Sequence, residues 1–404
     1  MPVNLEAPQT LAQVRGLRIG AVSLGVRAQP RDDLTLFELA PGATTAATFT
    51  RNAFCAAPVH VAREHLGAAS PRFLVINAGN ANAGTGPAGM QAARRVCELV
   101  ASAGNCQGNE VLPFSTGVVG ELLDTKPFAK AMPAAVAALD SDAWIEASRS
   151  ILTTDIVAKG VSRRFTVNGH EHVITGIAKG SGMICPNMAT MLSFVATDAK
   201  VAGPLLQRLL VEAVDLSFNC ITVDGDTSTN DSCVLMATGV GESITESSAD
   251  DLQALRDALV DVCTVLAQAV VRDGEGASKF ITVDVEGGRD REECRAVAYT
   301  VAHSPLVKTA MFASDANWGR ILAAVGRSPL AELDTDCINM YLGDVMIVEN
   351  GGRAAAYREE DGAQVMARED ITIRIELNRG PAQATVWTCD LSHGYVSINA
   401  DYRS

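Results

Sequence analysis

Residues 178–196 read Ala-Lys-Gly-Ser-Gly-Met-Ile-Cys-Pro-Asn-Met-Ala-Thr-Met-Leu-Ser-Phe-Val-Ala, and the interpretation of the whole chain depends on this stretch. Its first half is rich in glycine and contains a proline, so we expect a loop there. Its second half, from Thr190 onward, is apolar and resembles a strand. The sequence therefore predicts a threonine at a loop-to-strand junction, directly after the small residue Ala189.

A threonine at such a junction is suited to self-processing. A strained loop would expose the Ala189 carbonyl to the Thr190 hydroxyl, and an N-to-O acyl shift followed by ester hydrolysis would leave Thr190 as a new N-terminus. Its α-amine, with a reference pKa of about 7.8, could then act as general base on its own hydroxyl. The competing interpretation is a β-branched residue that simply opens a strand.

The segments around this stretch predict both helices and strands. Apolar residues recur at intervals of three and four in 251–271 and 203–217, which indicates amphipathic helices. Residues 280–285 and 371–376 have the pattern of strands. Asn168-Gly169 separates two apolar runs and predicts a hairpin. The mixed order favours an α/β or α+β fold with layered sheets.

Glycine-rich turns follow three apolar runs of the chain. They begin at Asn77 (Asn-Ala-Gly-Asn-Ala-Asn-Ala-Gly), at Ser115 (Ser-Thr-Gly-Val-Val-Gly) and at Lys179 (Lys-Gly-Ser-Gly-Met-Ile-Cys-Pro). Glycines placed after strands let the backbone approach a ligand closely, although such turns are also ordinary loops.

Length and composition narrow the class of protein. The chain has 404 residues, which fits two domains, and 48% of them are hydrophobic, so a large core can form. Its net charge is −14. An acidic surface repels nucleic-acid phosphates and anionic lipid, so we expect neither nucleic acid nor a membrane as partner.

Cysteine and histidine usage indicates a reducing compartment and no metal site. Ten cysteines are scattered through the chain without a CxxC pair, as reduced cytosolic thiols are. Among the histidines, His170 and His172 are two apart and no HExxH motif occurs. The N-terminus lacks the features of a secretory signal, and no apolar run approaches the roughly 20 residues of a membrane helix. We therefore expect a cytoplasmic protein.

Eight short blocks occur in order along nearly the whole chain. They begin at Asn77 (NAGNANAGTG), Ser115 (STGVVG), Thr153 (TTD), Lys179 (KGSGMI), Met188 (MATML), Asp224 (DGDTSTND), Asp315 (DANWGR) and Asp390 (DLSHGYV). Together they resemble the ornithine acetyltransferase family, also called glutamate N-acetyltransferase. Each block alone is weak evidence for the family, but eight blocks in this order and at suitable spacing make the resemblance specific.

The resemblance implies a layered sandwich with two β-sheets between helices, the fold of a self-processing acyltransferase. It implies cleavage between Ala189 and Thr190 into fragments 1–189 and 190–404, assembled as a heterotetramer with two copies of each. The implied reaction is ping-pong transfer of an acetyl group from N-acetylornithine through Thr190 to glutamate, in arginine biosynthesis. That cycle needs no dissociable cofactor, and acetyl-CoA is an alternative donor in some family members.

Site residues are also implied by the resemblance. Thr116 and Gly117 match the oxyanion hole. The substrate-binding positions of the family fall on Thr153, Lys179, Thr190, Glu275, Asn399 and Ser404. The family often ends in threonine where this chain ends in Ser404, and serine keeps the hydroxyl. Lys179 suits a substrate carboxylate and Glu275 the amine of ornithine.

Several alternatives remain at this level. A self-processing aminopeptidase or amidohydrolase would use the same nucleophile and release acetate to water. A non-catalytic binding protein would use the glycine-rich turns only to hold an anion. Without the resemblance, Lys179 would be a solvated loop lysine and Glu275 an exposed loop acid. The block 224–231 has no assigned role and could be a cation-binding or loop-stabilising turn.

Overall fold

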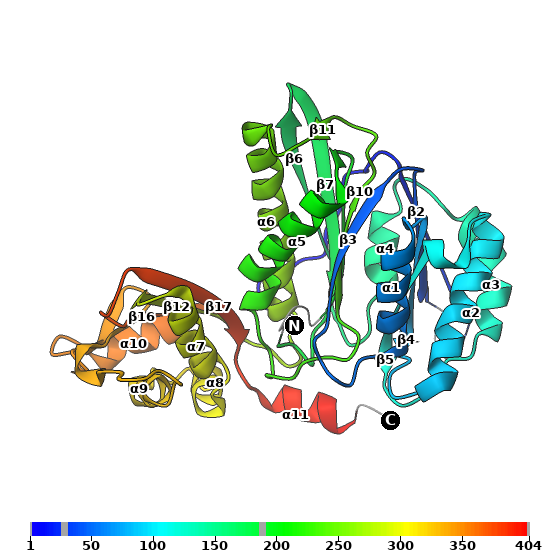
Figure 1. Cartoon of the computed structure of the whole chain (residues 1–404). Helices are drawn as coiled ribbons and strands as arrows, with labels where there is room; N and C mark the ends of the chain where they lie inside the picture. Colours follow the sequence, from blue (N-terminus) through cyan, green and yellow to red (C-terminus); the bar gives the residue numbers. More distant parts are fainter. Residues whose placement is uncertain (1, 26–30, 186–190, 402–404) are drawn as a thin grey trace.

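A computed structural model describes residues 2–25, 31–185 and 191–401. They form a sandwich of two sheets between helices, followed by a smaller C-terminal module with a sheet of its own (Figure 1). The predicted layered α/β architecture is thus confirmed. The separate C-terminal sheet was not predicted.

The first sheet of the sandwich has the strand order β1-β2-β4-β5, with β4 and β5 parallel and the other pairs antiparallel. Its strands are β1 (Leu17–Val22), β2 (Leu34–Leu39), β4 (Phe73–Asn80) and β5 (Val111–Val118). Helices α1 (Ala57–Ala68), α2 (Gly86–Gly104) and α3 (Lys126–Ala137) pack on its outer face.

The second sheet has the order β3-β10-β8-β7-β6, in which only the β10–β8 pair is parallel. Its strands are β3 (Thr44–Phe49), β6 (Lys159–Val167), β7 (His170–Lys179), β8 (Leu192–Thr197) and β10 (Ser232–Ala237). Helices α5 (Gly203–Leu216) and α6 (Ala249–Arg272) cover its outer face. A two-stranded ribbon of β9 (Lys200–Val201) and β11 (Ser243–Ile244) extends beside it.

Aromatic side chains join the inner faces of the two sheets. Phe194 of β8 stacks on Phe37 of β2 with ring centroids 5.4 Å apart and meets Phe114 of β5 edge-on at 5.2 Å. Trp144, at the start of α4 (Trp144–Ser150), is buried against Phe37. This shared core fixes the two sheets relative to each other, and with them the strand ends that form the site.

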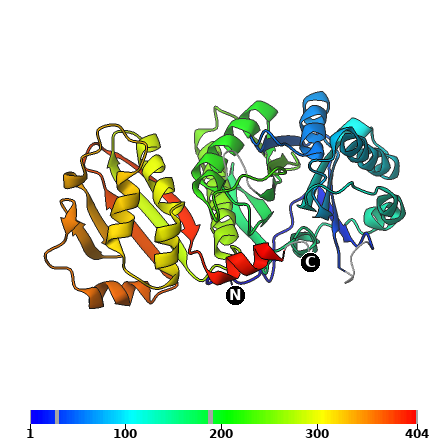
Figure 2. The same ribbon diagram turned by 90° about the horizontal axis from the view of Figure 1, so that it is seen from below.

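The C-terminal module has a six-stranded sheet in the order β15-β14-β13-β16-β12-β17. Its strands are β12 (Phe280–Gly288), β13 (Asn339–Leu342), β14 (Val345–Glu349), β15 (Gly352–Arg353), β16 (Asp370–Glu376) and β17 (Ala382–Cys389), and its helices are α7 (Arg291–Ala302), α8 (Pro305–Phe312), α9 (Trp318–Gly326) and α10 (Glu359–Met366). A last helix, α11 (His393–Ala400), leaves this module and crosses beneath the sandwich (Figure 2).

The predicted helices and strands are found where the sequence placed them. Residues 251–271 lie within α6, 203–217 match α5, and 371–376 lie in β16. The hairpin turn at Asn168 and Gly169 has φ values of 49° and 81°, as a type I′ turn requires. Two predicted turns begin later than expected, because β4 and β5 continue as a parallel pair through Asn80 and Val118.

Candidate active site

Two parallel strands of the first sheet approach each other closely at their carboxyl ends. Gly117 of β5 has a φ of 130°, and a Cβ there would lie 2.3 Å from the carbonyl carbon of Gly79 in β4. Only glycine fits this position. The ends of β4 and β5 therefore expose their backbone to the space beside them, because no side chain at Gly117 covers it.

A cavity of about 300 Å³ lies beside these strand ends. All six of the predicted site residues that the structure describes line it: Thr116, Gly117, Thr153, Lys179, Glu275 and Asn399. They come from β5, the loop after α4, the end of β7, the loop after α6, and α11. Segments up to almost three hundred positions apart in the sequence thus meet at one place.

Lys179 is the last residue of β7 and is only partly exposed, so it is not a solvated loop lysine. Its Nζ donates to Thr153 Oγ1 at 3.3 Å. Burial lowers the pKa of the Lys179 ammonium below its usual value, while nearby Asp155 opposes the shift. An ammonium group in this position can bind a carboxylate in the cavity.

Glu275 lies in the loop after α6 and is 7% exposed, which corrects the alternative of an exposed loop acid. Its carboxylate accepts from Asn399 Nδ2 at 2.8 Å, and its backbone N–H donates to Ser181 O at 2.8 Å. A Cβ on Gly182 would lie 2.4 Å from Glu275 Oε2. The carboxylate therefore needs a glycine at position 182 to occupy this place.

Asn230 holds the two glycine-rich strand ends together. Its side-chain amide is buried and donates to Ala81 O at 2.6 Å and to Ser115 O at 2.9 Å, while its Oδ1 accepts from Thr229 Oγ1 at 2.6 Å. Thr116, the next residue after Ser115, is buried at the cavity wall. The clamp fixes the backbone on which the predicted oxyanion hole depends.

The block 224–231, which contains Asn230, also fixes the glycine-rich loop after β7. Asp224 accepts from the backbone N–H groups of Met183 and Ile184 at 2.6 and 2.9 Å, and from Tyr395 Oη at 3.4 Å. The block therefore stabilises loops, one of the two roles left open by its composition. Over the described ranges, no group of three or more His, Cys, Asp or Glu side chains could hold a metal ion.

Three of the predicted residues, Ala189, Thr190 and Ser404, lie outside the described residues. The described chain resumes at Met191, which is buried, and Leu192 then pairs with Lys179 across the β7–β8 ladder. Met191, which follows Thr190 in sequence, is thus the neighbour of the residue that pairs with Lys179.

Among the helices of the described residues, we find none with the length and apolar character of a membrane span.

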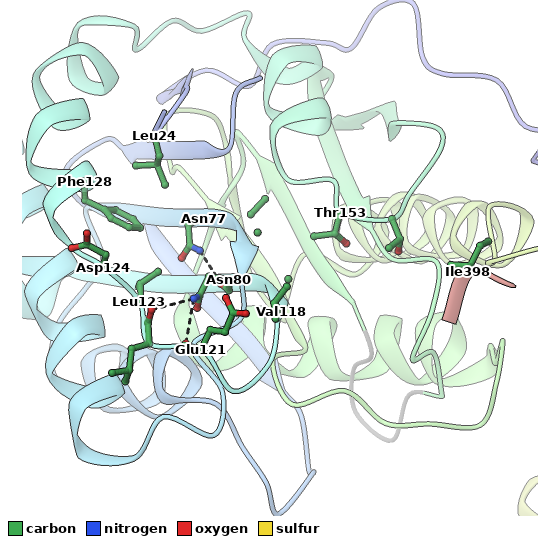
Figure 3. A pocket seen from close by; sticks show the side chains of 15 residues that line it. Leu24, Asn77, Asn80, Val118, Glu121, Leu123, Asp124, Phe128, Thr153 and Ile398 are labelled. Atoms are coloured by element: carbon green, nitrogen blue, oxygen red, sulfur yellow. Dashed lines mark hydrogen bonds between the residues drawn. The ribbon is translucent and has the colours of Figure 1, made fainter. Parts of the chain in front are cut away.

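A second, larger cavity of about 630 Å³ adjoins the first and shares Gly117, Val118, Thr153 and Thr154 with it (Figure 3). The rest of its lining combines apolar side chains with the amides of Asn77 and Asn80 and the carboxylates of Glu121 and Asp124, but none of the lysines or arginines that the structure describes lines it. The smaller cavity is the candidate active site, because the ammonium, carboxylate and hydroxyl groups converge there.

Sequence reasoning missed several residues that shape this site. Ser181 and Asn230 line the cavity, and Asp155 accepts backbone hydrogen bonds behind it. All three belong to matching blocks, which was the available signal. Their functions depend on partners distant in sequence, which no local pattern reveals.

Comparison with known proteins gives consistent matches. Residues 18–404 match the sequence model of the ArgJ family. A protein of Psychrobacter arcticus named arginine biosynthesis bifunctional protein ArgJ is 54% identical over 403 residues, 99% of both chains. The crystal structure of arginine biosynthesis bifunctional protein ArgJ from Bacillus halodurans is 39% identical with a TM-score of 0.50, over 52% of this chain and 99% of that chain. Ornithine acetyltransferase from Mycobacterium tuberculosis, solved with ornithine, is 30% identical with a TM-score of 0.39, over 44% and 94%.

Proposed function

Since the chain belongs to the ArgJ family, we propose that it is a glutamate N-acetyltransferase of arginine biosynthesis that uses Thr190 as its nucleophile. The observation that carries the proposal is the convergence of Thr116, Lys179 and Glu275 on one cavity. Hydroxyl, ammonium and carboxylate groups in one small cavity suit a substrate that has an acyl group, a carboxylate and an amine.

The first half-reaction is acetylation of the enzyme. The Thr190 hydroxyl attacks the acetyl carbonyl of N-acetylornithine, and the Thr116 hydroxyl with the Gly117 N–H stabilises the oxyanion that forms. Collapse of the tetrahedral intermediate breaks the C–N bond, and the departing ornithine amine takes the proton that the Thr190 hydroxyl lost. Lys179 holds the substrate carboxylate and Glu275 holds its side-chain amine.

The second half-reaction returns the enzyme to its starting state. The amine of glutamate attacks the acetyl ester, the ester C–O bond breaks, and the Thr190 oxygen takes up the proton from the amine. The α-amine of Thr190 is the general base in both half-reactions. Asn399 and Ser404 also contribute to substrate binding in this proposal. Acetyl-CoA serves as an alternative acetyl donor, in keeping with the bifunctional name of the Psychrobacter relative.

The proposal includes cleavage between Ala189 and Thr190. The point of cleavage falls between β7 and β8, which are antiparallel neighbours, so fragments 1–189 and 190–404 would remain paired in one sheet. The Bacillus halodurans chain offers support, because 52% of this chain matches 99% of it, so that polypeptide is about half as long. We further propose two copies of each fragment per molecule, and a cytoplasmic location in keeping with ten free cysteines.

Intact-mass measurement of the acyl-enzyme tests the proposal. Incubation with N-acetylornithine and no glutamate should add one acetyl group to the 215-residue fragment, and glutamate should then remove it. Discharge by water at the same rate without glutamate would favour an amidohydrolase, and absence of any adduct would favour a binding protein. An acetyl group on a lysine or cysteine, and not on Thr190, would overturn the mechanism.

A further inference from the structure

A buried ionic cluster lies directly behind the candidate active site. Lys159, at the start of β6, has its Nζ 2.7 Å from Asp155 Oδ1 and 2.6 Å from Asp273 Oδ2. All three side chains are completely buried, and none of them lines the cavity. The cluster therefore cannot act by touching a substrate in that cavity, and its effect has to pass through neighbouring residues.

Each carboxylate of the cluster also binds backbone that leads to a site residue. Asp155 accepts from the N–H of Gly180, next to Lys179, at 2.6 Å, and from the N–H of Thr153 at 3.1 Å. One carboxylate thus fixes both members of the Lys179–Thr153 hydrogen bond. It anchors the strand end from one side and the loop after α4 from the other.

Asp273 makes the corresponding connection to the other end of the cavity. Its Oδ2 accepts from the N–H groups of Ile156 and Val157 at 3.0 and 3.2 Å. It lies two residues before Glu275 in the same loop. Lys159 therefore joins the segment that carries Thr153 to the loop that carries Glu275.

Stability alone is a poor explanation for such a cluster. Replacing a buried ion pair with well-packed apolar residues is often neutral or stabilising, because the charges lose their hydration. We propose that Asp155 is a positioning residue that holds Lys179 in place and in its cationic form. Through Lys159 and Asp273, the same cluster fixes the distance between Lys179 and Glu275. This inference rests on the proposed function, in which those two residues hold the ends of the substrate.

The charges around Lys179 support this role. The groups that face it are Asp155, Asp231, Glu275 and Lys159. Burial raises the pKa of Asp231, which weakens it as a counter-charge. Although burial opposes ionisation of Asp155 as well, Lys159 and Lys179 together hold its pKa below the usual range. Asp155 is thus the ionised neighbour that acts most strongly on the ammonium.

An NMR titration tests the inference without relying on catalysis. The chain has only seven lysines, so protein labelled with ¹³C at lysine Cε gives few signals, and Lys179→Met assigns the one of interest. In Asp155→Asn the midpoint of Lys179 should fall by about one unit or more, because an opposite charge has been removed. In Lys159→Met the midpoint of Lys179 should rise, because a like charge has been removed. Asp261→Asn, which breaks an exposed ion pair with Arg163, is the matched control and should leave it unchanged.

Acetyl transfer gives the second readout. We expect kcat/KM of Asp155→Asn to fall by about 10²-fold, since displacement of a binding group by about 1 Å has effects of that size. Equal Lys179 midpoints in the two variants and wild type would overturn the inference even if transfer is slow. If neither variant folds, a wild-type Lys179 that is already neutral at pH 7 would overturn it equally, because the cluster would then not hold the ammonium in its cationic form. A wild-type protein that transfers no acetyl group would refute the proposed function instead, and the titration would still report on the cluster.

Discussion

Replacement of Gly182 by alanine is expected to weaken substrate binding while leaving the fold intact. The new Cβ would lie 2.4 Å from Glu275 Oε2, whereas ordinary contacts are about 3.5 Å, so the carboxylate has to move by about 1 Å. That movement breaks the hydrogen bond from Asn399. The displaced carboxylate also loses the hydrogen bond that we propose it accepts from the substrate amine. A hydrogen bond to a charged group contributes about 1.5–3 kcal/mol, which corresponds to a loss of roughly 10- to 10²-fold in kcat/KM for N-acetylornithine.

The assay is steady-state transfer from N-acetylornithine to glutamate, with thermal unfolding measured in parallel. The Tm should stay close to that of wild type, because the displaced atoms are the end of a flexible side chain. Gly326→Ala is the control, since a Cβ there meets nothing within 4 Å. In the double variant with Glu275→Gln the losses should not add, because both changes remove the same interaction. A kcat/KM of Gly182→Ala equal to that of the control would refute the reasoning.

Three further predictions concern the oxyanion hole, the cleavage and the Asn230 clamp. Thr116→Ala should lower kcat by about 10²–10³-fold, and an unchanged kcat would remove Thr116 from the mechanism. Denaturing electrophoresis should give fragments of 189 and 215 residues, the second beginning with Thr190, whereas Thr190→Ala should remain one chain of 404; a fully active, uncut wild type would contradict this. Asn230→Ala leaves the carbonyl groups of Ala81 and Ser115 without their donor. In the uncut Thr190→Ala background it should lower the free energy of unfolding by about 2–4 kcal/mol in denaturant titrations, and a negligible change would show that the clamp is dispensable.

The parts of the fold that could be predicted from sequence are those with local causes. Periodicity placed α5 and α6, and Asn168-Gly169 placed the β6–β7 hairpin, because such patterns depend on neighbouring residues. The extension of β4 and β5 through their glycine-rich ends could not be predicted. It depends on the close pairing of Gly79 with Gly117, which only the folded sheet creates.

The site shows the same division. Thr153 and Lys179 could be named because they stand in blocks that resemble a family, and Glu275 because it matches a substrate-binding position of that family, but their burial could not be predicted. Glu275 would be an exposed acid by its glycine neighbours alone, yet Ser181 and Asn399 enclose it. Lys159 carried no signal at all, since one lysine in a strand is unremarkable until its two carboxylate partners are known.

The antiparallel pairing of β7 with β8 also bears on the order in which the protein folds and is cleaved. If the chain is cut between these strands, the sheet they share has to form first, while one covalent chain keeps them close. Separate fragments would have to find each other by a concentration-dependent encounter and then pair strands buried in the middle of a sheet. Denaturation of the mature protein is therefore expected to be hard to reverse, and two separately expressed halves should reassemble poorly. The mature protein would therefore be kinetically stable, with a lifetime set by the slow rate at which the paired strands separate.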